Sequence, residues 1–240
     1  RFLMEFCVDD AIFKLFPGIR FVCVVADGIN PEKINTEAIE HMLREGWKIA
    51  GQAAFMYGNP QSHPNIKPWV ARLKAIGVSR KKFPNSIESM VRRAGKGGEP
   101  FHIIPLVDFY NSIALSHIVP AGGFDIDQMQ EGLSLRLSRE GDRFMALDEE
   151  KEINVPAGEV SYADGNQIVT RQFVWKQAKH LLLNEKTKNV FFVSEILGDL
   201  PYETADNVAK ALVNGLWKCF GISTTAHILD ERNTHLAINE

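Results

Sequence analysis

The sequence predicts an α+β protein in which a mixed sheet is flanked by helices. Three observations favour this fold class. The β-branched and aromatic residues at 19–26 lead into Asp27-Gly28, as in a buried strand that ends at a turn. Several shorter runs of the same kind, separated by turn residues, follow between 133 and 175. Apolar residues then recur at helical spacing from 205 to 220, and Gly221 ends that helix.

Most other helices are expected in the first half of the chain. One begins at Thr36 and continues toward the stop signal at 58–60. A short helix covers 64–75, and another starts at Asn85, where Asn85 is the cap and Glu88 follows three residues later. Pro105 opens the next, because proline is well tolerated in the first turn of a helix.

The remaining strands are expected at 133–137, 143–147, 159–163, 167–175, 189–195 and 222–229. Asp164-Gly165 is a hairpin signal between two of them, and residues 120–125 read as a tight loop. The chain has no internal repeat and no linker long enough to divide it. One α+β domain is the simplest interpretation, although the helical first part and the sheet could form two lobes.

Composition excludes several classes of protein. The 240 residues are 45% hydrophobic and 24% charged, with a net charge of −3, so a dedicated nucleic-acid binder is not indicated, although a local basic patch is compatible with this average. The three cysteines are far apart in sequence, as in proteins of reducing compartments. No apolar stretch reaches the roughly 18 residues of a membrane span, and the start lacks a secretory signal. We therefore expect a cytoplasmic protein.

The common catalytic motifs are missing from the sequence. It contains no phosphate loop, dinucleotide fingerprint or nucleophile elbow. Its seven histidines never occur at the spacing of a zinc site. We therefore expect neither a metal nor a cofactor. A Ser/His/Asp triad cannot be assembled from spacing, because triads are spatial.

Polar and glycine residues in the middle of the chain suggest a pocket, and each also has a purely structural interpretation. Gly122-Gly123 would let a backbone approach a ligand, or would simply make a turn. Arg92 could clamp a phosphate, or complement the dipole at a helix end. Trp175 could be core, whereas Lys176-Gln177 places polar groups where a strand ends, a frequent location of binding residues.

Two motifs identify a family resemblance. Residues 104–111, followed by 120–127, resemble a signature of the B3/B4 domain, the editing module in the beta subunit of phenylalanyl-tRNA synthetase. Residues 86–93, 156–160, 171–177 and 187–193 are similar to the free-standing branch of that family. The resemblance extends over roughly residues 4–220, and its motifs occur in the family's order.

The resemblance implies a single domain over 4–230, with a helical part at 30–117, a strand-rich part at 118–195 and a C-terminal helix at 202–220. It implies a pocket that transiently binds the aminoacylated 3′ end of a tRNA and hydrolyses a wrongly attached amino acid. An aminoacyl ester is already activated, so a site that positions water and stabilises the oxyanion suffices without metal, cofactor or covalent nucleophile.

The resemblance also implies roles for individual residues. Asp125 and Glu195 are the candidates for orienting the water. The candidates for binding substrate are Arg92, Asn111, Ala121, Gly122, Gly123, Arg171, Trp175 and Gln177. The synthetases have histidine where this chain has Gly122 and glutamate where it has Val193; Glu195 lies two residues on, on the same face of a strand.

Two alternatives to editing remain open at this level. The protein could be a non-catalytic module that binds tRNA, a free amino acid or a synthetase partner. It could also be an unrelated hydrolase on the same fold, because a fold does not determine function.

Overall fold

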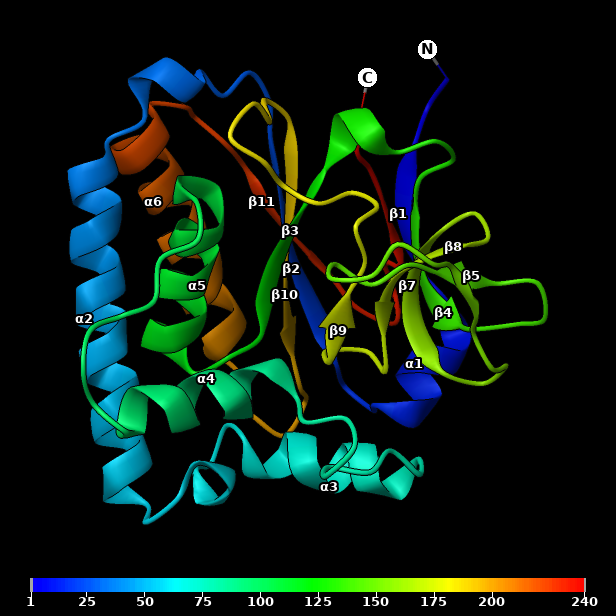
Figure 1. Ribbon diagram of the computed structural model, residues 1–240, viewed down its shortest axis with the longest axis horizontal. Coiled ribbons are helices and arrows are strands. Elements are labelled where there is room, and N and C mark those ends of the chain that lie inside the picture. Colours follow the sequence, from blue (N-terminus) through cyan, green and yellow to red (C-terminus); the bar gives the residue numbers. More distant parts are fainter. Residues whose placement is uncertain (1, 240) are drawn as a thin grey trace.

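The structure is a computed structural model that describes residues 2–239. Its main elements form three layers (Figure 1): a group of helices, a four-stranded sheet, and a second, larger sheet. Helices and sheets are both extensive and the larger sheet is mixed, so the α+β fold class is confirmed.

The four-stranded sheet is the middle layer and is entirely antiparallel. Its order is β11 (Ala226–Leu229), β2 (Arg20–Ala26), β10 (Val190–Ile196) and β3 (Ala121–Asp125). Every residue of β10 is buried, as expected for a strand covered on both faces.

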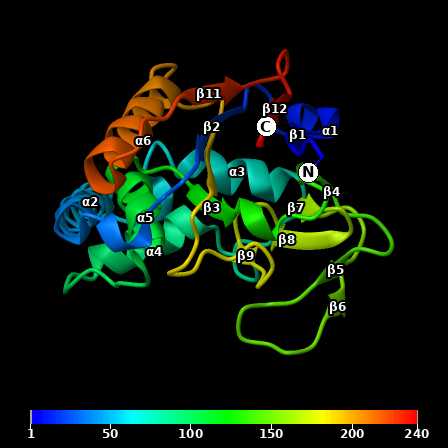
Figure 2. The same cartoon turned by 90° about the horizontal axis from the view of Figure 1, so that it is seen from above.

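The larger sheet pairs segments from both ends of the chain. Its order is β12 (His235–Ala237), β1 (Glu5–Val8), β4 (Leu133–Leu137), β7 (Val160–Asp164), β8 (Gln167–Arg171), β5 (Arg143–Phe144) and β6 (Ile153–Asn154), with β9 (Lys176–Gln177) also paired to β8. The β1–β4 and β5–β8 pairs are parallel. Figure 2 shows the β5–β6 region projecting from the body of the protein.

The helices are α1 (Asp10–Leu15), α2 (Thr36–Met56), α3 (Lys67–Ala75), α4 (Ser86–Gly95), α5 (Pro105–His117) and α6 (Thr204–Phe220). Helix α1 lies beside β4 of the larger sheet, whereas α2, α4, α5 and α6 pack together as the helical layer. Phe109 of α5 joins this layer to the middle sheet: its ring centroid is 5.6 Å from that of Phe192 in β10 and 5.2 Å from that of Phe220 in α6. Such edge-on ring contacts stabilise packing beyond the area that they bury.

Aromatic rings also fill the space between the two sheets. The ring centroid of Phe6 in β1 is 5.0 Å from that of Phe191 in β10, and the centroid of Tyr162 in β7 is 5.6 Å from that of Phe124 in β3. Side chains alternate between the faces of a strand, so residues 191, 193 and 195 all point from β10 toward the larger sheet. This alternation places Glu195 between the sheets.

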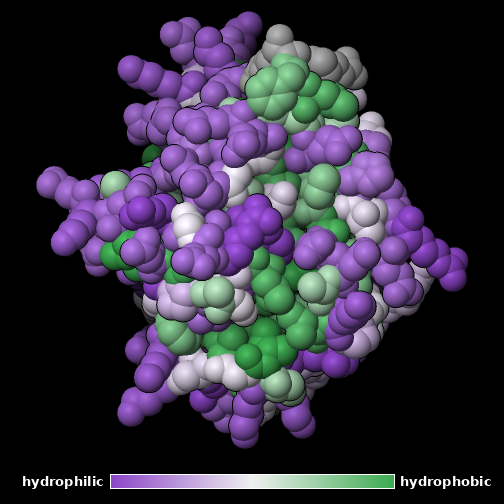
Figure 3. All heavy atoms as spheres, turned by 90° about the vertical axis from the view of Figure 1, so that its right-hand side faces the viewer, coloured by the Kyte–Doolittle hydropathy of each residue, from purple (hydrophilic) through white to green (hydrophobic). Residues whose placement is uncertain are grey.

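The outer side of the larger sheet is mostly polar. Figure 3 views the molecule from that side: hydrophilic residues cover most of the surface, and hydrophobic residues gather at its top and toward its lower middle.

Several sequence expectations are confirmed. A helix begins at Thr36, Pro105 opens α5, and the Asn85 side chain caps α4 by accepting a hydrogen bond from the Glu88 amide at 2.8 Å. The expected strand at 133–137 coincides with β4. The strands β1 and β12 and the short helix α1 were not predicted.

The expectation of a tight loop at 120–125 was wrong, because residues 121–125 form the strand β3. Neither Gly122 nor Gly123 adopts a positive φ, so neither uses the freedom that would have made a turn. Gly122 pairs with Val193, and Gly123 with Phe192. A β-carbon on Gly123 would lie 3.0 Å from Leu183 Cδ1, so close packing explains that glycine.

The strand expected at 167–175 is also shorter than predicted. β8 ends at Arg171, and Gln172 and Phe173 then take positive φ angles of 47° and 64°. The chain turns back so that β9 pairs with β8, which leaves Trp175 in the connecting turn. The strand expected at 143–147 covers only two residues. Trp217 is one of the apolar residues at helical spacing in the last helix, but its side chain faces outward and the residue is 64% exposed.

Candidate functional site

A pocket of about 190 Å³ lies where α4, α5, β3, β10 and the turn around Trp175 meet. At about 30 Å³ per water molecule, it has room for on the order of six waters. That is the space of one amino-acid side chain rather than of a nucleotide. Most of its accessible lining is apolar, and a few polar groups converge on it, as is typical of small-molecule sites.

The pocket brings together six of the ten predicted site residues, which the sequence spreads over more than eighty positions. They are Asn111, Ala121, Gly122, Trp175, Gln177 and Glu195. They come from four parts of the fold: Asn111 from α5, the alanine–glycine pair from the edge strand β3, Trp175 and Gln177 from the turn before β9 and from β9 itself, and Glu195 from β10. Because Gly122 and Val193 are paired across β3 and β10, the two positions that differ from the synthetase pattern are neighbours here.

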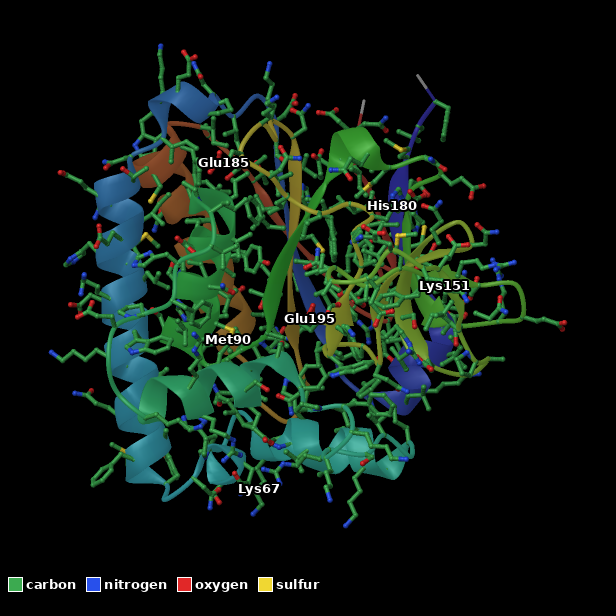
Figure 4. All side chains as sticks on the ribbon, viewed as in Figure 1. Lys67, Met90, Lys151, His180, Glu185 and Glu195 are labelled. Atoms are coloured by element: carbon green, nitrogen blue, oxygen red, sulfur yellow. The ribbon has the colours of Figure 1, made fainter. Side chains whose placement is uncertain are left out.

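Glu195 is the most unusual polar group of the pocket. Its side chain is only 4% exposed, and its Oε1 accepts a hydrogen bond of 3.1 Å from the hydroxyl of Tyr162. Its Oε2 is buried and has no hydrogen-bond partner among residues 2–239. A buried polar atom is rarely left unpaired, so this oxygen is a natural partner for a ligand or a water in the pocket. Figure 4 shows Glu195 in the interior, to the right of Met90 of α4.

Burial also changes the acidity of Glu195. Removal from water raises the pKa of Glu195 from the ordinary value of 4.5 to about 7, while the hydrogen bond from Tyr162 opposes the rise. A carboxyl group with a pKa near 7 can take up or release a proton at neutral pH. The pKa of Tyr162 is in turn raised well above its usual value, first by burial and then by the charge of Glu195, so Tyr162 stays a hydrogen-bond donor.

Trp175 and the groups around it form one wall of the pocket. The ring of Phe83 meets that of Trp175 edge-on, with 4.6 Å between centroids. The Lys176 ammonium and the Arg171 guanidinium lie 5.6 and 5.7 Å from the Trp175 ring centroid. Cations at this distance are attracted to the face of a tryptophan ring. The wall therefore combines an aromatic surface with positive charge.

The other four predicted residues do not line this pocket. The buried carboxylate of Asp125 accepts hydrogen bonds from the Asp127 amide (3.0 Å), Gln128 Nε2 (2.9 Å) and Thr187 Oγ1 (3.0 Å). These bonds fix the turn that follows β3. Gly123 belongs to the same strand but packs against Phe192.

The two predicted arginines are held by carboxylates. Arg171 makes a bidentate pair with the buried Glu159, with distances of 3.0 and 2.6 Å. Arg92 contacts Glu88 Oε2 at 3.2 Å and Gln61 Oε1 at 3.0 Å. Their roles in binding phosphate or carboxylate, like the roles of Asp125 and Gly123, stay predictions.

Several pocket residues were not singled out from the sequence. Tyr162, Tyr110, Met90 and Thr170 all line the pocket. Tyr162 carried a usable signal: it lies within the expected strand at 159–163, and a buried tyrosine hydroxyl usually needs a hydrogen-bond partner. That partner, Glu195, is 33 residues away, and sequence spacing could not reveal it.

No three His, Cys, Asp or Glu side chains within residues 2–239 converge on a point where a metal ion could bind. No helix in this part of the chain is long and apolar enough to cross a membrane.

Comparison with known proteins identifies the family. The sequence profile of the B3/4 domain matches residues 71–201, more than half of the chain. The fold is similar to a crystal structure of an N-terminal fragment of the phenylalanyl-tRNA synthetase beta subunit from Pyrococcus horikoshii, with 11% identity and a TM-score of 0.46. The similarity covers 93% of this chain but only 49% of the synthetase fragment, so the chain spans about half the length of that fragment. No curated protein sequence matches the chain.

Proposed function

The chain belongs to the B3/4 domain family, and we propose that its pocket binds the aminoacyl end of a tRNA and hydrolyses the ester of a wrongly attached amino acid. The single observation that carries this proposal is Glu195. A buried carboxyl group with a pKa of about 7 and an unpaired oxygen lies in a pocket large enough for one amino-acid side chain.

Glu195 orients and deprotonates the attacking water in this proposal. Its Oε1 is held by Tyr162, so the carboxyl plane is fixed while Oε2 is left to accept a hydrogen bond from water. As the water attacks the ester carbonyl, its proton passes to Oε2; when the ester C–O bond then breaks, the same proton passes from Oε2 to the departing ribose oxygen, which releases the amino acid and the ribose hydroxyl and restores the carboxylate. General base catalysis of this kind is effective when the pKa of the base is close to the working pH.

The remaining pocket groups position the substrate. Trp175 offers a flat apolar surface, and Asn111 and Gln177 supply amide groups that can bind the amino group or the ribose. Gly122 leaves space beside Val193, since a β-carbon at this position would have no neighbour within 4 Å. The pocket then selects its amino acid by the size of the side chain and by whether a polar group of that side chain can bond to a polar group of the pocket.

The test is a deacylation assay against a panel of correctly and wrongly charged tRNAs. Glu195→Gln keeps the side-chain shape but cannot accept the proton, so we expect the release of the mischarged amino acid to fall by 100-fold or more, as is typical when a general base is lost. Trp175→Ala should weaken binding as well. Glu185→Gln is the matched control, because Glu185 is exposed and lies well away from Glu195 in Figure 4. Equal rates for the two glutamine variants would refute the role of Glu195.

A second function is favoured by one feature of the site. None of the residues that line the pocket is a histidine, and Gly122 occupies the position at which the synthetases carry one. A non-catalytic module that binds an amino acid would fit this lining. Such a protein would show a higher melting temperature with one free amino acid and no deacylation of any tRNA in the panel.

A further inference from the structure

Positive charge is concentrated in residues 67–96, which comprise α3, the loop after it and α4. Nine residues of this segment are basic and one, Glu88, is acidic, so its net charge is +8. The whole chain has a net charge of −3, which leaves −11 on the remaining residues. The basic residues are Lys67, Arg72, Lys74, Arg80, Lys81, Lys82, Arg92, Arg93 and Lys96.

Much of this charge is free to meet a partner. All five lysines of the segment are exposed, and none forms a salt bridge with any residue between 2 and 239. Arg80 and Arg92 share one carboxylate, that of Glu88, at 2.7 and 3.2 Å. One carboxylate cannot neutralise two guanidinium groups, so this pair also leaves an excess of positive charge.

The basic segment adjoins the pocket. The inner side of α4 lines the pocket with Ser86, Ile87 and Met90. Lys82 directly precedes Phe83, whose ring packs on that of Trp175 in the pocket wall. In Figure 4, Lys67 lies at the lower edge of the molecule, below both Met90 and Glu195. A polyanion on this segment would therefore lie next to the pocket wall that Trp175 forms.

We propose that residues 67–96 form a docking surface for the sugar-phosphate backbone of an RNA duplex. This inference rests on the proposed function, in which the duplex is the stem that leads to the aminoacylated 3′ end. Exposed lysines bind phosphates as point charges and release counterions, which makes the affinity depend on salt. The net negative charge of the remaining residues repels the same backbone, which favours approach of the RNA from the basic segment.

The test compares two double variants with the same change in charge. Lys81→Ala with Lys82→Ala removes two charges from the basic segment, whereas Lys186→Ala with Lys188→Ala removes two exposed charges outside it. Binding of non-aminoacylated tRNA and of a blunt RNA duplex is measured between 50 and 200 mM salt. We expect the first variant to reduce the slope of log affinity against log salt by about 2. The loss of affinity between 50 and 200 mM salt should then be about 16 times smaller for this variant than for the parent protein. The second should keep the slope of the parent protein.

Two outcomes would overturn the proposal. One is an equal salt slope for Lys81→Ala with Lys82→Ala and for Lys186→Ala with Lys188→Ala. The other is tighter binding of the protein to anionic lipid vesicles than to the RNAs. Lys81→Arg with Lys82→Arg should restore the slope, which separates charge from packing.

The readout uses RNA without an amino acid, so it is independent of catalysis. If Glu195→Gln abolishes deacylation while Lys81→Ala with Lys82→Ala binds RNA normally, the docking surface is refuted and the proposed function stands. If no tRNA is deacylated but Lys81→Ala with Lys82→Ala binds RNA more weakly, the proposed function fails and the docking surface stands.

Discussion

Replacement of Glu195 by glutamine should change how the stability of the protein depends on pH. The folded protein holds the Glu195 proton up to a pH of about 7, whereas the unfolded chain releases it near the ordinary value of 4.5. Between these values the folded state binds more protons than the unfolded state. The free energy of unfolding therefore falls as the pH rises through this window.

The magnitude follows from the two pKa values. Each pH unit in the window changes the free energy of unfolding by about 1.36 kcal/mol, so the difference between 4.5 and about 7 corresponds to about 3 kcal/mol. This contribution is fully present below pH 4.5 and is lost above pH 7. Glutamine has the same shape and cannot ionise, so the Glu195→Gln variant lacks this loss.

The assay is urea unfolding of the parent and the variant at pH 4.5 and pH 8. We expect the parent to lose about 3 kcal/mol more than Glu195→Gln between the two conditions. Other titrating groups contribute equally to both proteins and cancel in the comparison. Glu185→Gln serves as the control, since the residue is exposed. If the parent and Glu195→Gln respond to pH identically, Glu195 is not desolvated and the reasoning about the pocket fails.

Three further predictions concern the pocket and its surroundings. Gly122→Val should leave folding nearly unchanged and reduce ligand binding, because the new side chain would enter open pocket space. Gly123→Val should instead destabilise the fold by about 1–3 kcal/mol, because its side chain would collide with Leu183 and Phe192. Melting temperatures and binding assays of both variants check this. Tyr162→Phe removes the hydrogen bond that lowers the pKa of Glu195, so the midpoint of the enzymatic deacylation rate against pH, after subtraction of spontaneous hydrolysis, should move above 7; an unchanged midpoint would contradict the assignment. Arg171→Ala leaves the buried Glu159 carboxylate without its partner and should cost about 3 kcal/mol in urea unfolding, and a fully stable variant with weaker tRNA binding would instead support a role in substrate binding.

Local patterns explain which parts of the fold could be predicted from the sequence. The cap at Asn85, the proline that opens α5, the alternation in β4 and the apolar run of β10 depend on neighbouring residues, so short segments reveal them. The strand β3 was missed because two adjacent glycines favour a turn when they are considered locally. Its strand conformation comes from pairing with β10, which is more than sixty residues away.

The candidate site shows the same division between local and distant information. Motif order led to Asn111, Gly122, Trp175, Gln177 and Glu195, and the structure brings them to one pocket. The order of the motifs could not show that Asp125 and Arg171 already have partners of their own, because those partners come from other segments of the fold. Charge clustering in 67–96 was visible in the sequence, but its position beside the pocket depends on how α4 packs.

The position of Glu195 gives a physical reason why this pocket could work without the synthetase arrangement. Side chains two residues apart on a strand share a face, so residues 193 and 195 both point from β10 into the same space. A glutamate at either position therefore reaches the pocket, but at points about 7 Å apart along the strand. Because the displaced carboxyl holds the attacking water, the amino acid would have to lie differently in the pocket to bring its ester to this water. The proposed pocket should therefore prefer a different amino acid from the one that the synthetase pattern selects, and the panel of charged tRNAs tests this directly. Selective release of tyrosine, the amino acid that the family resemblance implies for the synthetase, would show that the displacement leaves specificity unchanged.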